Sequence, residues 1–327
     1  MSASWSVSEH LVDRCVERSL EQAPRWLRHD LDAAHLRRAA ERQVREDLDR
    51  VANPDFARGF QRACPYPTAE LEDYAFKLLP IGVTQWLVTS LRFYGGDVTW
   101  PFVQLDHATI PIVDRNGWQI VDKALSEAYG HIAPRAIRVF AETDERLREL
   151  SLRPVRCDVR YLAATLGQLR SVELATPPPG LAVEPVERVS PESFDRYREV
   201  YERMRERSPI HRPNQIWLQT REELDAAARN GALAEVKVDG SWAGLFAYQA
   251  ASDLCFDGFC VLEAALAETF RGRGIAAHVH RRMVELLAGP DDAVLFGTVL
   301  EGNEPSARAA MRSGRRASGA YWFVDFP

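Results

Sequence analysis

Lysine is almost absent from this sequence. Lys77, Lys123 and Lys237 are the only lysines among its 41 basic residues, so the other 38 are arginines. The acidic residues number 47, which gives a net charge of −6. A mildly acidic chain without basic runs predicts neither a nucleic-acid partner nor a membrane partner, but it leaves room for a small local anion site.

Cysteine is also scarce, and long apolar runs are missing. The five cysteines form neither a CxxC motif nor a Cys/His spacing, which argues against a zinc site and a secreted disulfide framework. We therefore expect no metal and a reducing compartment. No apolar run approaches about 18 residues, and Glu9, His10 and Asp13 interrupt the stretch where a signal peptide would be apolar. The sequence predicts a cytoplasmic protein.

The length and the apolar spacing predict an α/β protein with more than one domain. At 327 residues the chain is more than twice the common domain size of about 150. In the first 60 residues, apolar residues recur every three to four positions, and this spacing predicts helices. Beyond them we expect strands at about 76–79, 86–91 and 101–105, a helix at 117–129, a strand at 136–141 and a short helix at 144–150.

A proline run separates this series of elements from a second one. Residues 176–180 read Thr-Pro-Pro-Pro-Gly, and consecutive prolines exclude both helix and central strand, so we interpret them as a linker. The second series is predicted as a strand (181–186), two helices (191–207, 221–230), three strands (233–238, 242–248, 259–266), a helix (274–287), a strand (293–299), a helix (304–312) and a strand (320–326).

The two series resemble each other in sequence. A shift of 157 residues places Phe102 on Phe259, Asp106 on Glu263 and Gly117 on Gly274. This register favours a tandem duplication. Chance agreement between two α/β segments is the alternative.

A glycine-rich turn is the sharpest motif. Residues 270–277 read Phe-Arg-Gly-Arg-Gly-Ile-Ala-Ala, between a predicted strand and a predicted helix. The first-turn N–H groups of a helix lack partners and can cradle a pyrophosphate. A Walker loop is excluded because no Gly-Lys pair exists, and a dinucleotide loop would need glycine at Ala277. An Arg/Gly-rich surface turn is the alternative.

This turn resembles the [RQ]xxGx[GA] motif of the GNAT N-acyltransferase superfamily, and Asn303 with Ser306 and Gly314 resembles that family's later N-x-x-[AS]…G segment. The resemblance covers residues 181–327. It implies an α/β (α+β) fold with a mixed sheet, acetyl-CoA as co-substrate, and transfer of an acetyl group to a primary amine of a small molecule. It implies pyrophosphate contacts from Arg271, Gly272, Arg273, Gly274, Ile275 and Ala276, and pantetheine contacts from Ala265, Leu266, Asn303 and Ser306.

Combined with the duplication, the resemblance gives a domain plan. It has an N-terminal helical region (1–70), a degenerate GNAT-like domain (71–175), a linker (176–180) and an active GNAT domain (181–327). At the shift of 157, Asp114 takes the place of Arg271 and Asn116 that of Arg273. Because a carboxylate repels pyrophosphate, we expect the first domain to have lost cofactor binding and to serve as a structural partner or as a wall of the acceptor site.

Acetyl transfer to an amine needs a base and a way for the thiolate to leave. Glu263, an acid in an apolar strand, is the candidate base, because partial burial would raise its pKa. A solvent-facing or Arg-paired Glu263 is the alternative. Many GNAT relatives carry a Tyr where Ala310 stands, and that Tyr protonates the departing thiolate. Alanine has no proton to give, so Tyr321 or Tyr248 is the candidate acid. Departure of the thiolate without an acid is the alternative.

Three histidines outside the glycine turn are the remaining residues with an expected place or role. His211 is a candidate acceptor contact in the loop after residue 207, whereas His278 and His280 are expected at the surface. The oligomeric state is expected to be monomer or homodimer. Because Ala310 replaces the Tyr, a non-catalytic CoA-binding or interaction protein stays open as an alternative function, as does a transferase with another acyl donor.

Overall fold

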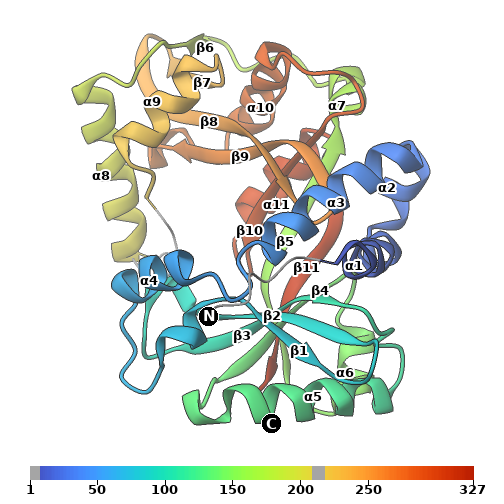
Figure 1. Ribbon diagram of the computed structural model, residues 1–327. Coiled ribbons are helices and arrows are strands. Elements are labelled where there is room, and N and C mark those ends of the chain that lie inside the picture. The colour runs from blue at the N-terminus through green and yellow to red at the C-terminus, as the bar shows by residue number, and fades with distance from the viewer. Residues whose placement is uncertain (1–7, 208–217) are drawn as a thin grey trace. The chain divides into compact units, whose positions relative to one another are not determined.

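The computed structural model describes residues 8–207 and 218–327, and the chain divides into two compact units (Figure 1). Unit 1 contains the chain up to Asp158 together with Asp253–Cys255 and Gly319–Pro327. Unit 2 contains Val159–Ser252 and Phe256–Ser318. The chain is mixed α and β, with helices at its N-terminal end, as the sequence predicts.

Unit 1 begins with helices whose starts are fixed by local capping. They are α1 (Glu9–Gln22), α2 (Arg25–Asp30), α3 (Ala33–Leu48) and α4 (Pro54–Ala63). The Asp32 carboxylate accepts hydrogen bonds from the N–H groups of Ala34 and His35, so first-turn donors of α3 are satisfied. Asn53 caps α4 in the same way, and Pro54 fills its first position.

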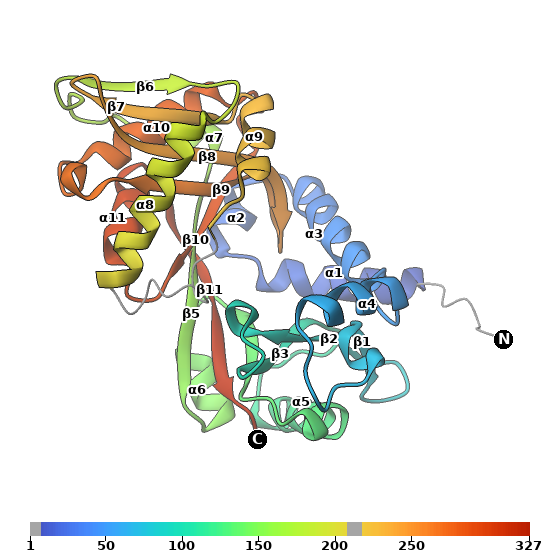
Figure 2. The same cartoon turned by 90° about the vertical axis from the view of Figure 1, so that its left-hand side faces the viewer.

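The sheet of unit 1 has the order β1-β2-β3-β4-β11. Its strands are β1 (Lys77–Pro80), β2 (Trp86–Phe93), β3 (Pro101–Ala108), β4 (Ala136–Ala141) and the C-terminal part of β11 (Arg316–Asp325). Figures 1 and 2 show α5 (Arg115–Tyr129) on one face of this sheet and α1 and α4 on the other. Trp118, Leu125 and Tyr129 of α5 are buried in the core of the unit. Helix α6 (Glu145–Ser151) follows β4.

The sheet of unit 2 has the order β6-β7-β8-β9-β10-β5. Its strands are β6 (Leu181–Pro185), β7 (Leu233–Val238), β8 (Ser241–Asp253), β9 (Phe256–Leu266), β10 (Val294–Leu300) and the C-terminal part of β5 (Val155–Thr165). Its helices are α7 (Leu166–Ser171), α8 (Pro191–Arg207), α9 (Arg221–Arg229), α10 (Ile275–Leu286) and α11 (Glu304–Arg312). Two separate apolar clusters, one around α10 and one around α8 and α9, show that these helices cover opposite faces of the sheet.

Each unit contains one parallel strand pair that separates after a short contact. In unit 2, β9 and β10 pair only from Gly258–Val294 to Cys260–Phe296, although β9 continues to Leu266 and β10 to Leu300. In unit 1, β3 and β4 pair only from Phe102–Ala136 to Gln104–Arg138. Beyond these contacts the two strands of each pair form no further backbone ladder with each other. The first strand of each pair is followed by a helix, α5 after β3 and α10 after β9.

Each unit completes its sheet with a strand that comes from the far part of the chain. The β5 segment Val159–Thr165 pairs antiparallel with β10 in unit 2, and the β11 segment Ala320–Asp325 pairs antiparallel with β4 in unit 1. No element is expected from the sequence between residues 151 and 175, so β5 was missed. Charged residues at 156, 158 and 160 and alanines at 163 and 164 hide its strand pattern. The proline segment 176–180 lies within unit 2.

Candidate functional site

The glycine turn begins helix α10, as the sequence predicts. Gly272 and Gly274 have φ values of 73° and 76°, a left-handed conformation that favours glycine. A Cβ at either position would meet no atom within 4 Å, so the main chain is open to approach. No described residue accepts a hydrogen bond from the N–H groups of residues 272–276. The turn therefore fits the pyrophosphate of a nucleotide-type ligand.

The two arginines of the turn have different contacts. Arg271 Nε donates to the Leu266 carbonyl oxygen at 2.8 Å, which ties the turn to the end of β9. Burial lowers the pKa of Arg271, while Glu268 opposes this effect. The Arg273 guanidinium lies 5.5 Å from the centre of the Phe270 ring. Arg271 therefore stiffens the turn, and Arg273 is held over its surface by a cation–π contact.

The separation of β9 and β10 places backbone groups beside this turn. Ala265 and Leu266, predicted to contact pantetheine, lie in the part of β9 that has left β10. On its other side β9 remains attached to β8, where Ala267 N–H donates to the Ala243 carbonyl oxygen at 2.8 Å. The free edge of β9 thus fits an extended arm with amide groups, which can hydrogen bond to a strand edge as another strand would.

Asn303 and Ser306 lie together at the start of α11. Asn303 is the N-cap of this helix, and its Oδ1 accepts a hydrogen bond from Ser306 N–H at 3.4 Å. Both follow β10, the second strand of the separating pair. Their predicted pantetheine contact remains a prediction.

Glu263 is buried on β9, and its side chain is held by two tyrosines of α8. Only 6% of the residue is exposed. Tyr197 Oη donates to Oε2, and Tyr201 Oη lies 2.7 Å and 2.8 Å from the two carboxylate oxygens. The N–H of Ala264 donates to Oε1 at 2.8 Å. The alternatives of a solvent-facing or Arg-paired Glu263 are thereby excluded.

The environment of Glu263 shifts its proton affinity. Burial raises the pKa of Glu263 above its ordinary value, and the hydrogen bonds from Tyr197, Tyr201 and Ala264 limit that rise. The same burial and the neighbouring carboxylate raise the pKa of Tyr201 well above its ordinary value. The tyrosines therefore stay protonated and donate, and the carboxyl is a stronger base than a solvated one.

Tyr197 and Tyr201 were missed by the sequence analysis. They lie four residues apart on α8 and therefore share the face that packs on the sheet. That spacing, opposite an acid in an apolar strand, was the available signal. Gln219 N–H also donates to Tyr197 Oη at 3.1 Å, which fixes this ring further.

The candidate acids occupy other environments. Tyr321 lies in unit 1, where the Arg138 guanidinium is 3.8 Å from its ring centre, whereas Glu263 lies in unit 2. Ala310 is buried against Leu162 and Ala307. The catalytic role of Tyr321 remains a prediction, and His211 lies outside the described residues.

His280 was expected at the surface, and that expectation is wrong. It is 3% exposed, and its Nδ1 is 2.5 Å from Tyr248 Oη. Its Nε2 is 3.1 Å from Arg315 Nη2. His280 shares the inward stripe of α10 with Met283 and Val284, whereas His278, two residues earlier, is half-buried.

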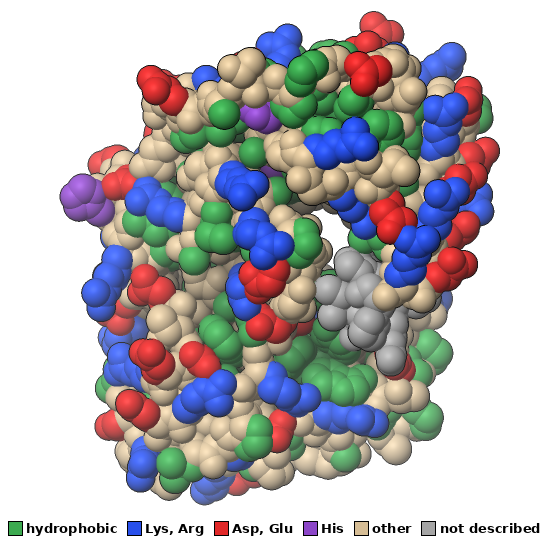
Figure 3. Space-filling view, turned by 180° about the vertical axis from the view of Figure 1, so that it is seen from behind, with side chains coloured by type: hydrophobic (Ala, Val, Ile, Leu, Met, Phe, Trp, Pro, Cys, Tyr) green, Lys and Arg blue, Asp and Glu red, His purple; other side chains and the backbone are tan. Residues whose placement is uncertain are grey.

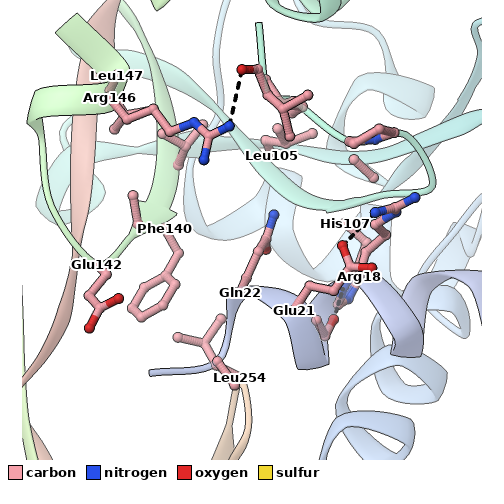
Figure 4. A pocket seen from close by; sticks show the side chains of 18 of the residues that line it. Arg18, Glu21, Gln22, Leu105, His107, Phe140, Glu142, Arg146, Leu147 and Leu254 are labelled. Carbon is pink, nitrogen blue, oxygen red and sulfur yellow. Dashed lines mark hydrogen bonds and ion pairs between the residues drawn. The ribbon is translucent and has the colours of Figure 1, made fainter. Parts of the chain in front are cut away.

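In unit 1 the first turn of α5 is capped by a side chain, unlike the first turn of α10. Asp114 caps α5, and its Oδ1 accepts the Gly117 N–H at 2.8 Å. A cavity of about 680 Å³ nevertheless lies where β3 and β4 separate. Figure 4 shows Gln22, Phe140 and Leu254 pointing into it. Arg146 Nη2, on the same cavity, donates to the Val113 carbonyl oxygen at 3.0 Å. This end of α5 thus carries a carboxylate where an anion would have to bind.

The described residues also show how charge is distributed and whether a metal cluster or a membrane-spanning helix is present. Basic and acidic side chains are intermixed over the face in Figure 3. Within residues 8–207 and 218–327, no cluster of three or more His, Cys, Asp or Glu side chains could hold a metal ion. No helix in this part of the chain is long and apolar enough to cross a membrane.

No protein-family model matches the chain, and no curated protein matches its sequence. Its structural neighbours include GNAT acetyltransferases. A tandem GNAT protein from the clavulanic acid biosynthesis pathway is 11% identical and covers 98% of this chain and 94% of its own, with a TM-score of 0.46. A GCN5-related N-acetyltransferase from Sphaerobacter thermophilus is 17% identical, with coverages of 86% and 93% and a TM-score of 0.46. A GNAT-family acetyltransferase from Colwellia psychrerythraea is 8% identical, with coverages of 86% and 97% and the same TM-score. At these values the likeness carries no argument about activity.

Proposed function

We propose that the protein is an acetyl-CoA-dependent N-acyltransferase that acetylates a primary amine of a small molecule. The observation that carries this proposal is the open glycine turn at the start of α10, placed at the end of a strand that has separated from its parallel neighbour. Residues 271–276 would hold the pyrophosphate, and the free edge of β9 with Asn303 would hold the pantetheine arm. The thioester supplies the acetyl group.

Glu263 acts as the base in this proposal. An amine attacks the thioester only in its neutral form, so a proton must leave the nitrogen. Because Tyr201 Oη bridges both oxygens of Glu263, this hydroxyl can pass the proton inward to the carboxylate as it accepts one from the amine. Burial raises the pKa of Glu263, which makes the carboxylate a better acceptor.

We further propose that the chain contains two GNAT-like domains in tandem, with residues 71–175 degenerate and 181–327 active. The matching parallel pairs β3/β4 and β9/β10, each followed by a helix, support a common origin. The Asp114 cap supports loss of cofactor binding in the first domain. That domain serves as a structural partner.

A labelled-acetyl assay tests the proposed activity. The protein is incubated with labelled acetyl-CoA and a metabolite extract, and mass spectrometry follows label transfer together with release of free CoA. Label in an amide product, lost in Arg271→Glu and retained in Arg282→Glu on the exposed side of α10, is the expected result. Absence of any labelled product and of CoA release would exclude the acyltransferase.

A non-catalytic CoA-binding protein is the second candidate, favoured by the buried Ala310 where many GNAT enzymes carry a Tyr. Calorimetry separates the two. Tight CoA binding that Arg271→Glu abolishes, without turnover of any amine in a broad panel, would select the binding protein.

A further inference from the structure

Two residues that depart from the GNAT pattern are joined in this protein. Ala310 stands where many relatives have a Tyr, and Arg315 stands where the family has a Phe after Gly314. The N–H of Arg315 donates to the Ala310 carbonyl oxygen at 3.1 Å. One departure removes a proton donor, and the other brings a cation into the same region.

Arg315 is a buried cation without an acidic partner. The residue is 5% exposed, and its Nε has no hydrogen-bond partner. No Asp or Glu in the described part of the chain forms an ion pair with it, and the groups whose charged forms would raise its pKa are Tyr248 and Cys260, neither of them a carboxylate. Burying an unpaired charge is strongly unfavourable, so this guanidinium is poised for an anionic or strongly polar group that the described residues do not supply.

His280 orients Arg315 without neutralising it. A guanidinium nitrogen can only donate, so Nε2 of His280 must accept the hydrogen bond from Nη2. The proton of the neutral imidazole is then on Nδ1, which donates to Tyr248 Oη. Burial and the Arg315 charge lower the pKa of His280 well below its ordinary value. The positive charge of Arg315 therefore stays uncompensated.

The guanidinium lies where β9 and β10 separate. Phe296 and Cys260 form the last strand pair, and Gly297 and Val261 follow them. A Cβ on Gly297 would lie 3.1 Å from Arg315 Nη1 and 3.1 Å from Val261 Cβ, so glycine leaves room for the side chain. From Val261 to Leu266 the free edge of β9 extends about 17 Å. An extended pantetheine arm spans about 15 Å. An arm held at the glycine turn would thus bring its sulfur toward Arg315.

We propose that Arg315 is a catalytic residue that stabilises the thiolate of CoA as it leaves. This inference rests on the proposed function. The amine nitrogen forms a bond to the thioester carbon, its proton passes to Glu263, and the carbon–sulfur bond breaks with its electron pair on sulfur. Arg315 holds the resulting thiolate, which takes a proton from solvent on release. A fixed positive charge replaces the general acid that Ala310 cannot be.

The thiol pKa of bound CoA tests this role without turnover. Ultraviolet absorbance of the thiolate is followed against pH for protein saturated with CoA, and the same titration with desulfo-CoA is subtracted to remove the protein's own cysteines. In wild type the bound thiol should titrate about one unit or more below free CoA. Arg315→Met should abolish the shift, Arg315→Lys should retain part of it, and Arg312→Met on the exposed side of α11 should leave it unchanged.

Binding and turnover complete the test. Desulfo-CoA should bind Arg315→Met within about twofold of wild type, while the acetylation rate falls about 100-fold. Methionine is expected to be tolerated because apolar replacement of a buried charge is often neutral for stability. A wild-type CoA complex whose thiol titrates as in free solution overturns the role of Arg315 but leaves the transferase intact. Failure to bind either ligand overturns both.

Discussion

Tyr201 Oη contacts both carboxylate oxygens of Glu263, at 2.7 Å and 2.8 Å. The hydroxyl comes from α8, the carboxylate from β9, and both are buried. A hydrogen bond to the ionised form lowers the pKa of the acid, whereas burial raises it. The affinity of Glu263 for a proton is therefore set by a balance that single substitutions can change in known directions.

Replacing Glu263 by Gln removes the proposed base while keeping the shape of the side chain. In wild type the rate should rise with pH as Glu263 ionises and becomes able to accept a proton. In Glu263→Gln the acetylation rate should fall by about 10²–10⁴-fold, and this rise with pH should disappear. Initial rates of CoA release from pH 5 to 9 measure both effects, with Glu222→Gln on the exposed side of α9 as the matched control. An unchanged profile would remove Glu263 from the mechanism.

Tyr201→Phe should lower the acetylation rate, because the hydroxyl that relays the amine proton to Glu263 is lost, and it should also shift the pH profile of the remaining activity. The hydroxyl lowers the pKa of Glu263, so its loss raises that pKa and moves the acidic limb of the rate profile to higher pH. Tyr94→Phe in unit 1 controls for the loss of a tyrosine hydroxyl elsewhere. A limb that moves to lower pH would contradict the proposed environment of Glu263.

The chain should bind one CoA. Gly272–Gly274 is open to an anion, whereas the first turn of α5 is capped by Asp114. Isothermal titration should give a stoichiometry of one, and Arg271→Glu should reduce it to zero because a carboxylate replaces the cation at the turn. Two equivalents bound per chain would show that unit 1 has kept a cofactor site.

Asp106 should make folding depend on pH. Burial raises the pKa of Asp106 from 3.8 to about 6, so the folded state holds this proton more firmly than the unfolded chain does. Its contribution to stability is present below pH 4 and is lost as the pH rises through 6. Asp106→Asn should increase the free energy of unfolding by about 1–3 kcal/mol at pH 7 and by almost nothing at pH 4. Urea unfolding at the two pH values measures the difference, and an equal effect at both would disprove it.

Much of unit 2 could be predicted because its local signals agree with its contacts. The helices at 191–207 and 304–312 and the strand at 233–238 have the predicted bounds, since each combines apolar periodicity with a clear start or stop. Strand β5 was not predictable in this way, because its partner β10 is more than 120 residues away in sequence and its pattern is interrupted by charges.

The site shows the same division. The glycine turn and the acid Glu263 are local features of one sequence segment, and both were found. Two other features depend on which helix packs against which strand. They are the contact of Tyr197 and Tyr201 with Glu263 and the burial of His280 against Arg315. Helical spacing places a residue on a face, but only the fold says what that face meets.

The exchange of β5 and β11 has a consequence for protein engineering. A gene cut at the proline segment 176–180 would yield a first fragment without the strand that covers β4, and a second fragment without the strand that covers β10. Each fragment would expose an unpaired strand edge, and such an edge promotes aggregation. A division of the chain at this segment therefore leaves neither sheet complete, so the two parts are expected to fold only when they are joined in one chain.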